Sequence, residues 1–184
     1  AYVAGVASSP DFPTVAALQP ALNGPSDAFV AKLDPTGSKL LMSTYLGGSF
    51  LDFATGITWS PFGLFITGFT HSLDFPTKRP RQFGFGDNDA FLVKMKNDGS
   101  AIEYSTYYSG SGNVYSNGVA VSVTAKIPPT SGDVAYIVGS TNGADLLVSP
   151  GTYGADKLIR ATDLFVAAFS DALIPGSVTL DALA

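Results

Sequence analysis

The segment DAFLVKMKNDGSAIEYSTY, Asp89–Tyr107, occurs in this chain in two closely similar forms. Sixty-two residues earlier, Asp27–Tyr45 reads DAFVAKLDPTGSKLLMSTY. In each copy, residues alternate between the two faces of an extended chain over the first seven positions, which is the period of a β-strand. A turn containing Asn-Asp-Gly or Asp-Pro-Thr-Gly follows, and then a run rich in β-branched and aromatic residues. Each copy therefore predicts two antiparallel strands joined by a tight turn.

Other segments recur at similar spacing, so the repeat extends along the chain. The strand-like segments Tyr2–Gly5, Phe65–Gly68 and Tyr136–Gly139 match one another, and the loop segment DFPT occurs at both Asp11–Thr14 and Asp74–Thr77. Matching positions lie 62 or 63 residues apart at first and 71 to 74 apart later. Self-similarity of this kind indicates a repeat architecture.

The repeat predicts an all-β chain built from β-propeller blades of four sequential antiparallel strands. About eleven strands make about three blades, which are residues 1–52 without a first strand, 53–114 and 115–184. Because both faces of the strand at 89–96 are apolar, we expect it to be covered on both sides. Closed propellers have about four to eight blades. We therefore expect a partial or open propeller, either a fragment of a larger ring or a subunit whose flanks are covered by partners.

Composition and charge limit the possible functions. The chain has 184 residues, of which 46% are hydrophobic and 14% charged, so it can form a packed core. Its net charge of −5 disfavours nucleic-acid binding, which depends on neutralising phosphates. The absence of cysteine excludes disulfides and thiol chemistry. No run of about 18 apolar residues occurs, so no transmembrane segment is predicted.

These repeats resemble the bacterial β-propeller repeat family often abbreviated SBBP. That family carries a pattern similar to DAFVAKLDPTG and STYLGG, followed by a GIAVD-like strand, VYVTG and DFPT. The matching stretches in this chain are Asp27–Gly37, Ser43–Gly48, Gly56-Ile57, Phe65–Thr70 and Asp74–Thr77. In the third unit, Pro150–Tyr153 resembles the PGAFQ segment of the family.

The resemblance implies a secreted or surface-associated bacterial protein and a scaffold rather than a particular reaction. The chain departs from the family pattern where the aspartate of the GIAVD-like strand is replaced, around Trp59 and Ser122, and where DFPT has diverged in the third unit. These departures concern the geometry by which blades would close into a ring.

The candidate catalytic residues are few, and we predict no enzymatic activity. His71 is the only histidine and Glu103 the only glutamate, and no partner residue is marked for either. The sequence contains neither a G-x-S-x-G elbow nor the Asp-box found in sialidase propellers. A lone histidine in a loop is usually a solvated surface residue.

A calcium site is a further possibility. Asp87 and Asp89 offer oxygen ligands two residues apart, of the kind that suits Ca²⁺. Only the second aspartate recurs in the other units, as Asp27 and Asp163. A recurring aspartate at the start of a strand is more readily explained by a turn in which its carboxylate accepts backbone N–H groups. We therefore predict no cofactor and treat calcium as the weaker alternative.

Binding is expected at the long loops 9–26, 71–88 and 142–162, because variable loops on a rigid scaffold usually carry recognition. In an up-and-down sheet, these loops and the connections between units emerge at the same end. The candidate contact residues are three aromatic residues and two arginines from the only basic cluster: Phe83, Phe85, Tyr153, Arg79 and Arg81. Phe12 and Phe75 repeat in register and are expected to pack in the core instead.

The sequence thus favours a non-catalytic structural and binding scaffold, extracellular or on the cell surface, that recognises protein or polysaccharide. One alternative is the flank of a propeller enzyme that processes glycans. Another is a structural subunit of a larger extracellular assembly. Because residue 1 falls inside a strand, we also expect the 184 residues to be an excerpt of a longer protein.

Overall fold

The structure is a computed structural model that describes residues 1–84, 87–124, 132–143, 145–146, 162–170 and 179–180. All eleven described elements are β-strands. They form three antiparallel sheets, as the sequence predicts for an all-β chain. Phe85 and Tyr153, two of the predicted contact residues, lie outside the described residues.

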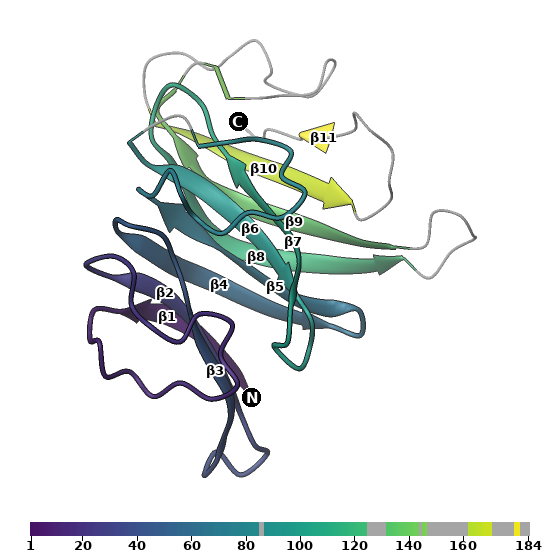
Figure 1. The fold of residues 1–184 in the computed structure, drawn as a ribbon. Coiled ribbons are helices and arrows are strands. Elements are labelled where there is room, and N and C mark those ends of the chain that lie inside the picture. The colour runs from purple at the N-terminus through teal and green to yellow at the C-terminus, as the bar shows by residue number, and fades with distance from the viewer. Residues whose placement is uncertain (85–86, 125–131, 144, 147–161, 171–178, 181–184) are drawn as a thin grey trace.

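In each sheet the strands pair in the order in which they follow one another along the chain (Figure 1). The first sheet contains β1 (Tyr2–Ala7), β2 (Asp27–Leu33) and β3 (Leu40–Leu46). The second contains β4 (Asp52–Ser60), β5 (Gly63–Thr70), β6 (Asp89–Met95) and β7 (Ile102–Tyr108). The third contains β8 (Val114–Thr124), β9 (Gly132–Thr141), β10 (Asp163–Ser170) and β11 (Thr179–Leu180).

The two hairpins of the repeated segment form where the sequence predicts them. Gly37 and Gly99 have φ angles of 74° and 76°, which glycine adopts without the steric cost of a side chain. Both hairpins also share a register shift, between Lys32 and Leu33 in one copy and between Lys94 and Met95 in the other. The two copies of the sequence therefore fold in the same way down to this irregularity.

The second sheet lies between the other two, so both of its faces are buried. The face turned toward the first sheet, here called the N-side face, carries Ile66, Phe91 and Val93. It packs in one hydrophobic cluster with Ala28 and Val30 of the first sheet. The opposite face, here called the C-side face, is turned toward the third sheet and carries Phe65, Ala90 and Leu92. It packs in a second cluster with Ile137 and Phe165 of the third sheet. All seven residues of β6 are buried, which confirms that this strand is covered on both sides.

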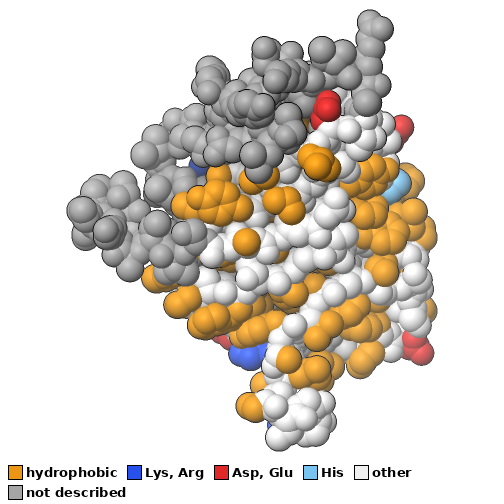
Figure 2. Space-filling view, turned by 180° about the vertical axis from the view of Figure 1, so that it is seen from behind, with side chains coloured by type: hydrophobic (Ala, Val, Ile, Leu, Met, Phe, Trp, Pro, Cys, Tyr) orange, Lys and Arg blue, Asp and Glu red, His pale blue; other side chains and the backbone are white. Residues whose placement is uncertain are grey.

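The first sheet has no strand equivalent to β4 or β8, and the described sheets form an open row rather than a closed ring (Figure 1). Figure 2 shows that hydrophobic side chains cover much of one side of the molecule, with few charged groups among them. No helix that could cross a membrane is found in the part of the chain that the structure describes.

The junctions between neighbouring sheets use the same backbone contacts. The Asp52 amide donates to the Ser26 carbonyl over 2.9 Å, and the Val114 amide donates to the Asn88 carbonyl over 2.8 Å. The two donors begin β4 and β8, the first strands of the second and third sheets. The two acceptors directly precede β2 and β6, which are equivalent strands of the sheets before them. The sequence repeat is therefore also a repeat of the contacts that join one sheet to the next.

Candidate binding site at the loop-bearing end

The long loops and the connections between sheets meet at one end of the molecule and line a cleft of about 740 Å³. The connection before β4 contributes Phe50, and the connection before β8 contributes Ser111, Gly112 and Asn113. The remaining lining residues come from the loops that follow β5 and β9: His71, Leu73, Asp87 and Asn142.

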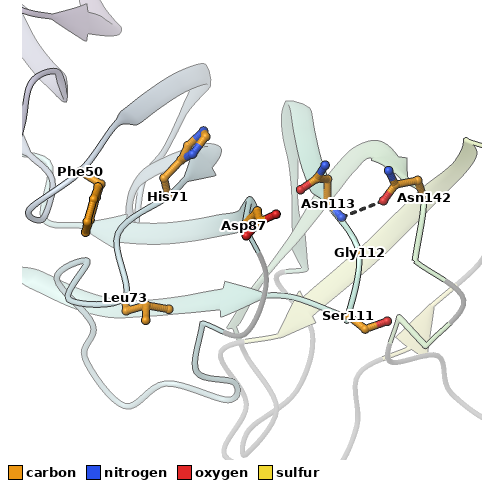
Figure 3. Close-up of a pocket in the computed structure, with 8 residues that line it drawn as sticks. All are labelled: Phe50, His71, Leu73, Asp87, Ser111, Gly112, Asn113 and Asn142. Carbon is orange, nitrogen blue, oxygen red and sulfur yellow. Dashed lines mark hydrogen bonds between the residues drawn. The ribbon is translucent and has the colours of Figure 1, made fainter.

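The cleft has an apolar side and a polar side (Figure 3). Phe50 and Leu73 lie with His71 on one side, and both apolar side chains are exposed to solvent. Asn113 and Asn142 lie on the other side, where the Asn113 amide donates to Asn142 Oδ1 over 2.8 Å. Asp87 stands between the two sides.

Two aspartates hold the connections that form the polar and apolar sides. The Ser111 amide and hydroxyl donate to Asp145 Oδ1 over 2.7 and 2.8 Å. One repeat earlier, the Ser49 amide and hydroxyl donate to Asp74 Oδ1 over 2.8 and 3.0 Å. These backbone hydrogen bonds, which favour the charged carboxylate, lower the pKa of both aspartates.

Further backbone pairing fixes the loops beside these connections. The His71 amide donates to the Leu51 carbonyl over 2.9 Å, and the Asn142 amide donates to the Asn113 carbonyl over 3.2 Å. His71 and Asn142 occupy equivalent places in the repeat. The same main-chain contact therefore holds both residues at the cleft, and the Asn142 side chain adds the hydrogen bond from the Asn113 amide.

The recurring aspartate at the start of a strand proves to be buried. Asp27 is fully enclosed, and its carboxylate accepts hydrogen bonds from Gln19 Nε2, from the Asn23 amide and from the Gly24 amide, over 2.6, 2.9 and 3.0 Å. Asp89, its equivalent in the second sheet, is also buried. This arrangement fits the turn-stabilising role that the sequence favoured for this position over metal binding.

Asp87 and Asp89 thus differ in their surroundings, since Asp87 lines the cleft and Asp89 is buried. Among the described residues, no three His, Asp or Glu side chains are grouped so that they could hold a metal ion.

The two arginines of the basic cluster lie outside the cleft lining. Arg79 Nη2 donates to the Glu103 carbonyl over 2.6 Å, and the Arg81 amide donates to Thr106 Oγ1 over 2.9 Å. Arg79 has a positive φ of 50°, and Ala16, its equivalent one repeat earlier, has a φ of 48°. The loop conformation at Arg79 is therefore a property of the repeat and does not require an arginine.

Phe83 is exposed on the loop after β5 and is not part of the cleft lining. Phe75 is buried against Phe91, with ring centroids 4.5 Å apart, as predicted for a core residue. Phe12 packs in the same way on Phe29, with centroids 4.7 Å apart, but it remains partly exposed because no sheet precedes it in the described row.

One buried carboxylate was not singled out from the sequence. Asp52 is fully enclosed and accepts hydrogen bonds from Thr70 Oγ1, from Ser72 Oγ and from the Gly48 amide. Burial raises its pKa to about 6, and the nearby charge of Asp27 acts in the same direction. The second repeat has Val114 at this place, so the repeat itself gave no reason to expect a carboxylate there.

The sequence likewise gave no reason to single out Phe50, Leu73, Asn113 or Asn142 as binding residues. They are ordinary loop residues, and only the pairing between sheets brings them together. The sequence indicated only that these residues lie in loops and connections that were expected to emerge at the same end of the sheets.

No protein-family model matches the chain, and no curated protein matches its sequence.

Proposed function

We propose that this chain is a non-catalytic binding scaffold and that the cleft at its loop-bearing end recognises a polysaccharide. The observation that carries the proposal is the composition of the cleft, in which exposed apolar side chains face amide and carboxylate groups across about 740 Å³. Sites of this volume typically combine apolar walls with a few polar groups that orient the ligand.

The scaffold in this proposal is a row of β-propeller blades of the bacterial repeat family that the sequence resembles. The four-stranded second and third sheets, with strands in chain order, support this assignment. The repeated junction contacts support it as well, since successive blades pack through equivalent residues. Membership of that family implies an extracellular or cell-surface location.

A saccharide fits the two sides of the cleft. Sugar rings present C–H groups on their faces and hydroxyl groups around their edges. The exposed ring of Phe50 can cover a sugar face, while Asn113, Asn142 and Asp87 offer donors and acceptors for hydroxyl groups. Asp27 and Asp52, whose carboxylates interact with each other, are both fully enclosed and do not line the cleft, so this pair is not placed to act on a sugar bound there.

The proposal is tested by titrating the protein with a panel of soluble neutral and acidic polysaccharides in a calorimeter. With a polysaccharide that binds, Phe50→Ala should weaken binding by about thirtyfold, because truncating a central aromatic contact typically costs about 2 kcal/mol. Phe62→Ala is the matched control, since Phe62 is 58% exposed and Phe50 59%, but Phe62 lies in the turn between β4 and β5 and not in the cleft. Absence of binding across the panel, or equal losses in the two variants, would contradict the proposal.

Recognition of a protein is the second candidate, and the exposed Phe83 favours it. Because Phe83 lies outside the cleft lining, a sugar chain confined to the cleft would not contact it, whereas a broader protein surface would. Phe83→Ala should leave polysaccharide binding unchanged. If Phe83→Ala instead loses affinity for a protein ligand and keeps the wild-type melting temperature, recognition of a protein is favoured over recognition of a polysaccharide.

A further inference from the structure

The fixed charge inside the cleft is negative in the part of the chain that the structure describes. Asp87 is exposed and lines the cleft, and Figure 3 shows its carboxylate between His71 on one side and Asn113 on the other. No lysine or arginine is among the described lining residues, and His71 is the only one of them that can become positively charged. A ligand in the cleft therefore meets a carboxylate and no permanent cation.

Two further carboxylates stand beside the cleft. Asp74 and Asp145 are both exposed, and each accepts hydrogen bonds from the amide and the hydroxyl of a serine, Ser49 or Ser111. These serines belong to the two connections that line the cleft. Because the hydrogen bonds lower the pKa of both aspartates, both carboxylates are charged at neutral pH. The negative charge at this end of the molecule is thus held in place by the contacts that shape the cleft.

Lysines gather at the opposite end of the sheets. The turns that join β2 to β3 and β6 to β7 emerge there, since the strands of each sheet run in alternating directions. Four lysines lie in these turns or at the strand ends beside them: Lys32, Lys39, Lys94 and Lys96. Their charges are separated from the cleft by the length of the strands.

The basic cluster also directs charge away from the cleft, although it belongs to the loop after β5. Lys78 Nζ donates to the Ile102 carbonyl and Arg79 Nη2 to the Glu103 carbonyl, each over 2.6 Å. These two carbonyls lie at the start of β7, whereas the connection that lines the cleft follows the end of that strand. At about 3.3 Å a residue, the separation along β7 is about 20 Å. The two cations therefore do not offset the carboxylates at the cleft.

This arrangement of charge distinguishes between classes of polysaccharide. A carboxylated or sulfated chain would bring negative groups close to Asp87, and a pair of like charges about 7 Å apart near a protein surface weakens binding by about tenfold. A neutral chain avoids this repulsion, and its hydroxyl groups can donate hydrogen bonds to the same carboxylate.

We propose that the cleft takes neutral polysaccharides and excludes acidic ones, and that Asp87 is the residue that sets this preference. The inference rests on the proposed binding function and adds the chemical class of the ligand.

Calorimetric titration with matched pairs of polysaccharides gives the first test. The probes are dextran and hydroxyethyl cellulose, which are neutral, and carboxymethyl dextran and carboxymethyl cellulose, which have the same backbones with added carboxylates. Any other neutral polysaccharide that binds can be carboxymethylated in the same way. The neutral member of a pair should bind at least about tenfold more tightly in 10 mM salt at pH 8, at which imidazole groups are ordinarily neutral. The difference should shrink in 1 M salt, where the screening length falls from about 30 to about 3 Å.

A substitution that removes one charge tests the role of Asp87. Asp87→Asn should reduce the ratio of neutral to carboxymethylated affinity by at least about threefold in 10 mM salt. Asp98→Asn is the matched control, because it removes the same charge from an exposed aspartate in the turn between β6 and β7, at the opposite end. The control should keep the wild-type ratio.

The outcomes separate this inference from the binding function on which it rests. Equal or tighter binding of the carboxymethylated members would overturn the neutral preference and leave polysaccharide binding intact. An equal change of the affinity ratio in the two variants would overturn the assignment to Asp87. Absence of binding by every polysaccharide would overturn the binding function and the inference together.

Discussion

Asp52 shows how one side chain can make stability depend on pH. Its carboxyl group is enclosed with three hydrogen-bond donors, Thr70, Ser72 and the Gly48 amide, none of which carries a positive charge that would offset the burial. Its pKa is raised from 3.8 to about 6. Between these values the folded protein holds a proton that the unfolded chain releases, so the free energy of unfolding falls as the pH rises through this window.

Asp52→Asn should remove this dependence. An asparagine can accept from Ser72 and the Gly48 amide and can donate to Thr70, so the contacts are preserved without the charge. The free energy of unfolding of the variant, relative to wild type, should therefore increase by up to about 3 kcal/mol between about pH 4 and pH 6. Urea unfolding at a series of pH values measures this difference.

Asp34→Asn is the control of opposite sign. The Thr36 hydroxyl, which donates to Asp34 over 2.8 Å, lowers the pKa of this carboxyl group. The stabilisation from Asp34 is present above its ordinary pKa and is lost as the pH falls. The control should therefore lose stability relative to wild type at neutral pH and regain it in acid. If the two variants changed in the same direction, the assignment of the titrating group would be wrong.

At the level of elements, one glycine position of the repeat faces a neighbouring strand in the second and third sheets but not in the first. Gly68 of β5 and Gly139 of β9 are equivalent, and each faces a bulged strand. A Cβ atom at Gly68 would lie 1.8 Å from the Phe53 carbonyl oxygen, and one at Gly139 would lie 1.9 Å from that of Tyr115. At the equivalent Gly5 there is no such strand, and the nearest atom is in the ring of Phe29 at 2.9 Å.

Gly68→Ala and Gly139→Ala should each lower the free energy of unfolding by at least about 2 kcal/mol, because a backbone carbonyl cannot move without displacing its strand. Gly5→Ala should cost clearly less, since an aromatic ring at a partly exposed site can rotate away. Thermal unfolding of the three variants, followed by circular dichroism, compares them directly. Equal losses at all three positions would mean that the neighbouring strand is not the cause.

The strands were predictable because each depends on local sequence. The strand predicted at 89–96 is β6 (Asp89–Met95), and the turn after it follows from Gly99. The bulges between Ala54 and Gly56 and between Ser116 and Gly118 were not predicted, because the alternation of residues does not show where one strand carries an extra residue.

The cleft was less predictable than the strands for a physical reason. Asn113 and Asn142 are 29 residues apart and meet only through pairing between a connection and a loop. Neither residue type is unusual in a loop, so composition did not single them out. Asp87 was singled out as a candidate calcium ligand because two aspartates at a spacing of two can suit a cation; in the structure it lines the cleft, whereas Asp89 is buried.

At the level of the whole molecule, the middle position of the second sheet should decide where the fold is most stable. Amide hydrogens in β6 should exchange most slowly, because this strand has a sheet on either face and a paired strand on either side. Amides of the equivalent strand β2 should exchange faster, since the first sheet is covered by a neighbouring sheet on one face only. Hydrogen exchange followed by mass spectrometry measures both, and slower exchange in β2 than in β6 would contradict this account.

The duplicated backbone contacts between sheets also have an evolutionary consequence. Phe50 and Gly112 occupy equivalent positions in the repeat, as do His71 and Asn142, yet within each pair the side chains have little in common. Main-chain hydrogen bonds and the Asp–Ser contacts are common to both repeats and hold these positions, so the side chains can diverge after a unit is duplicated, as Phe50 and Gly112 have. Each junction is thus a separate site for selection, and under the proposed binding function a lineage would gain a new specificity by copying a unit and altering a few exposed residues.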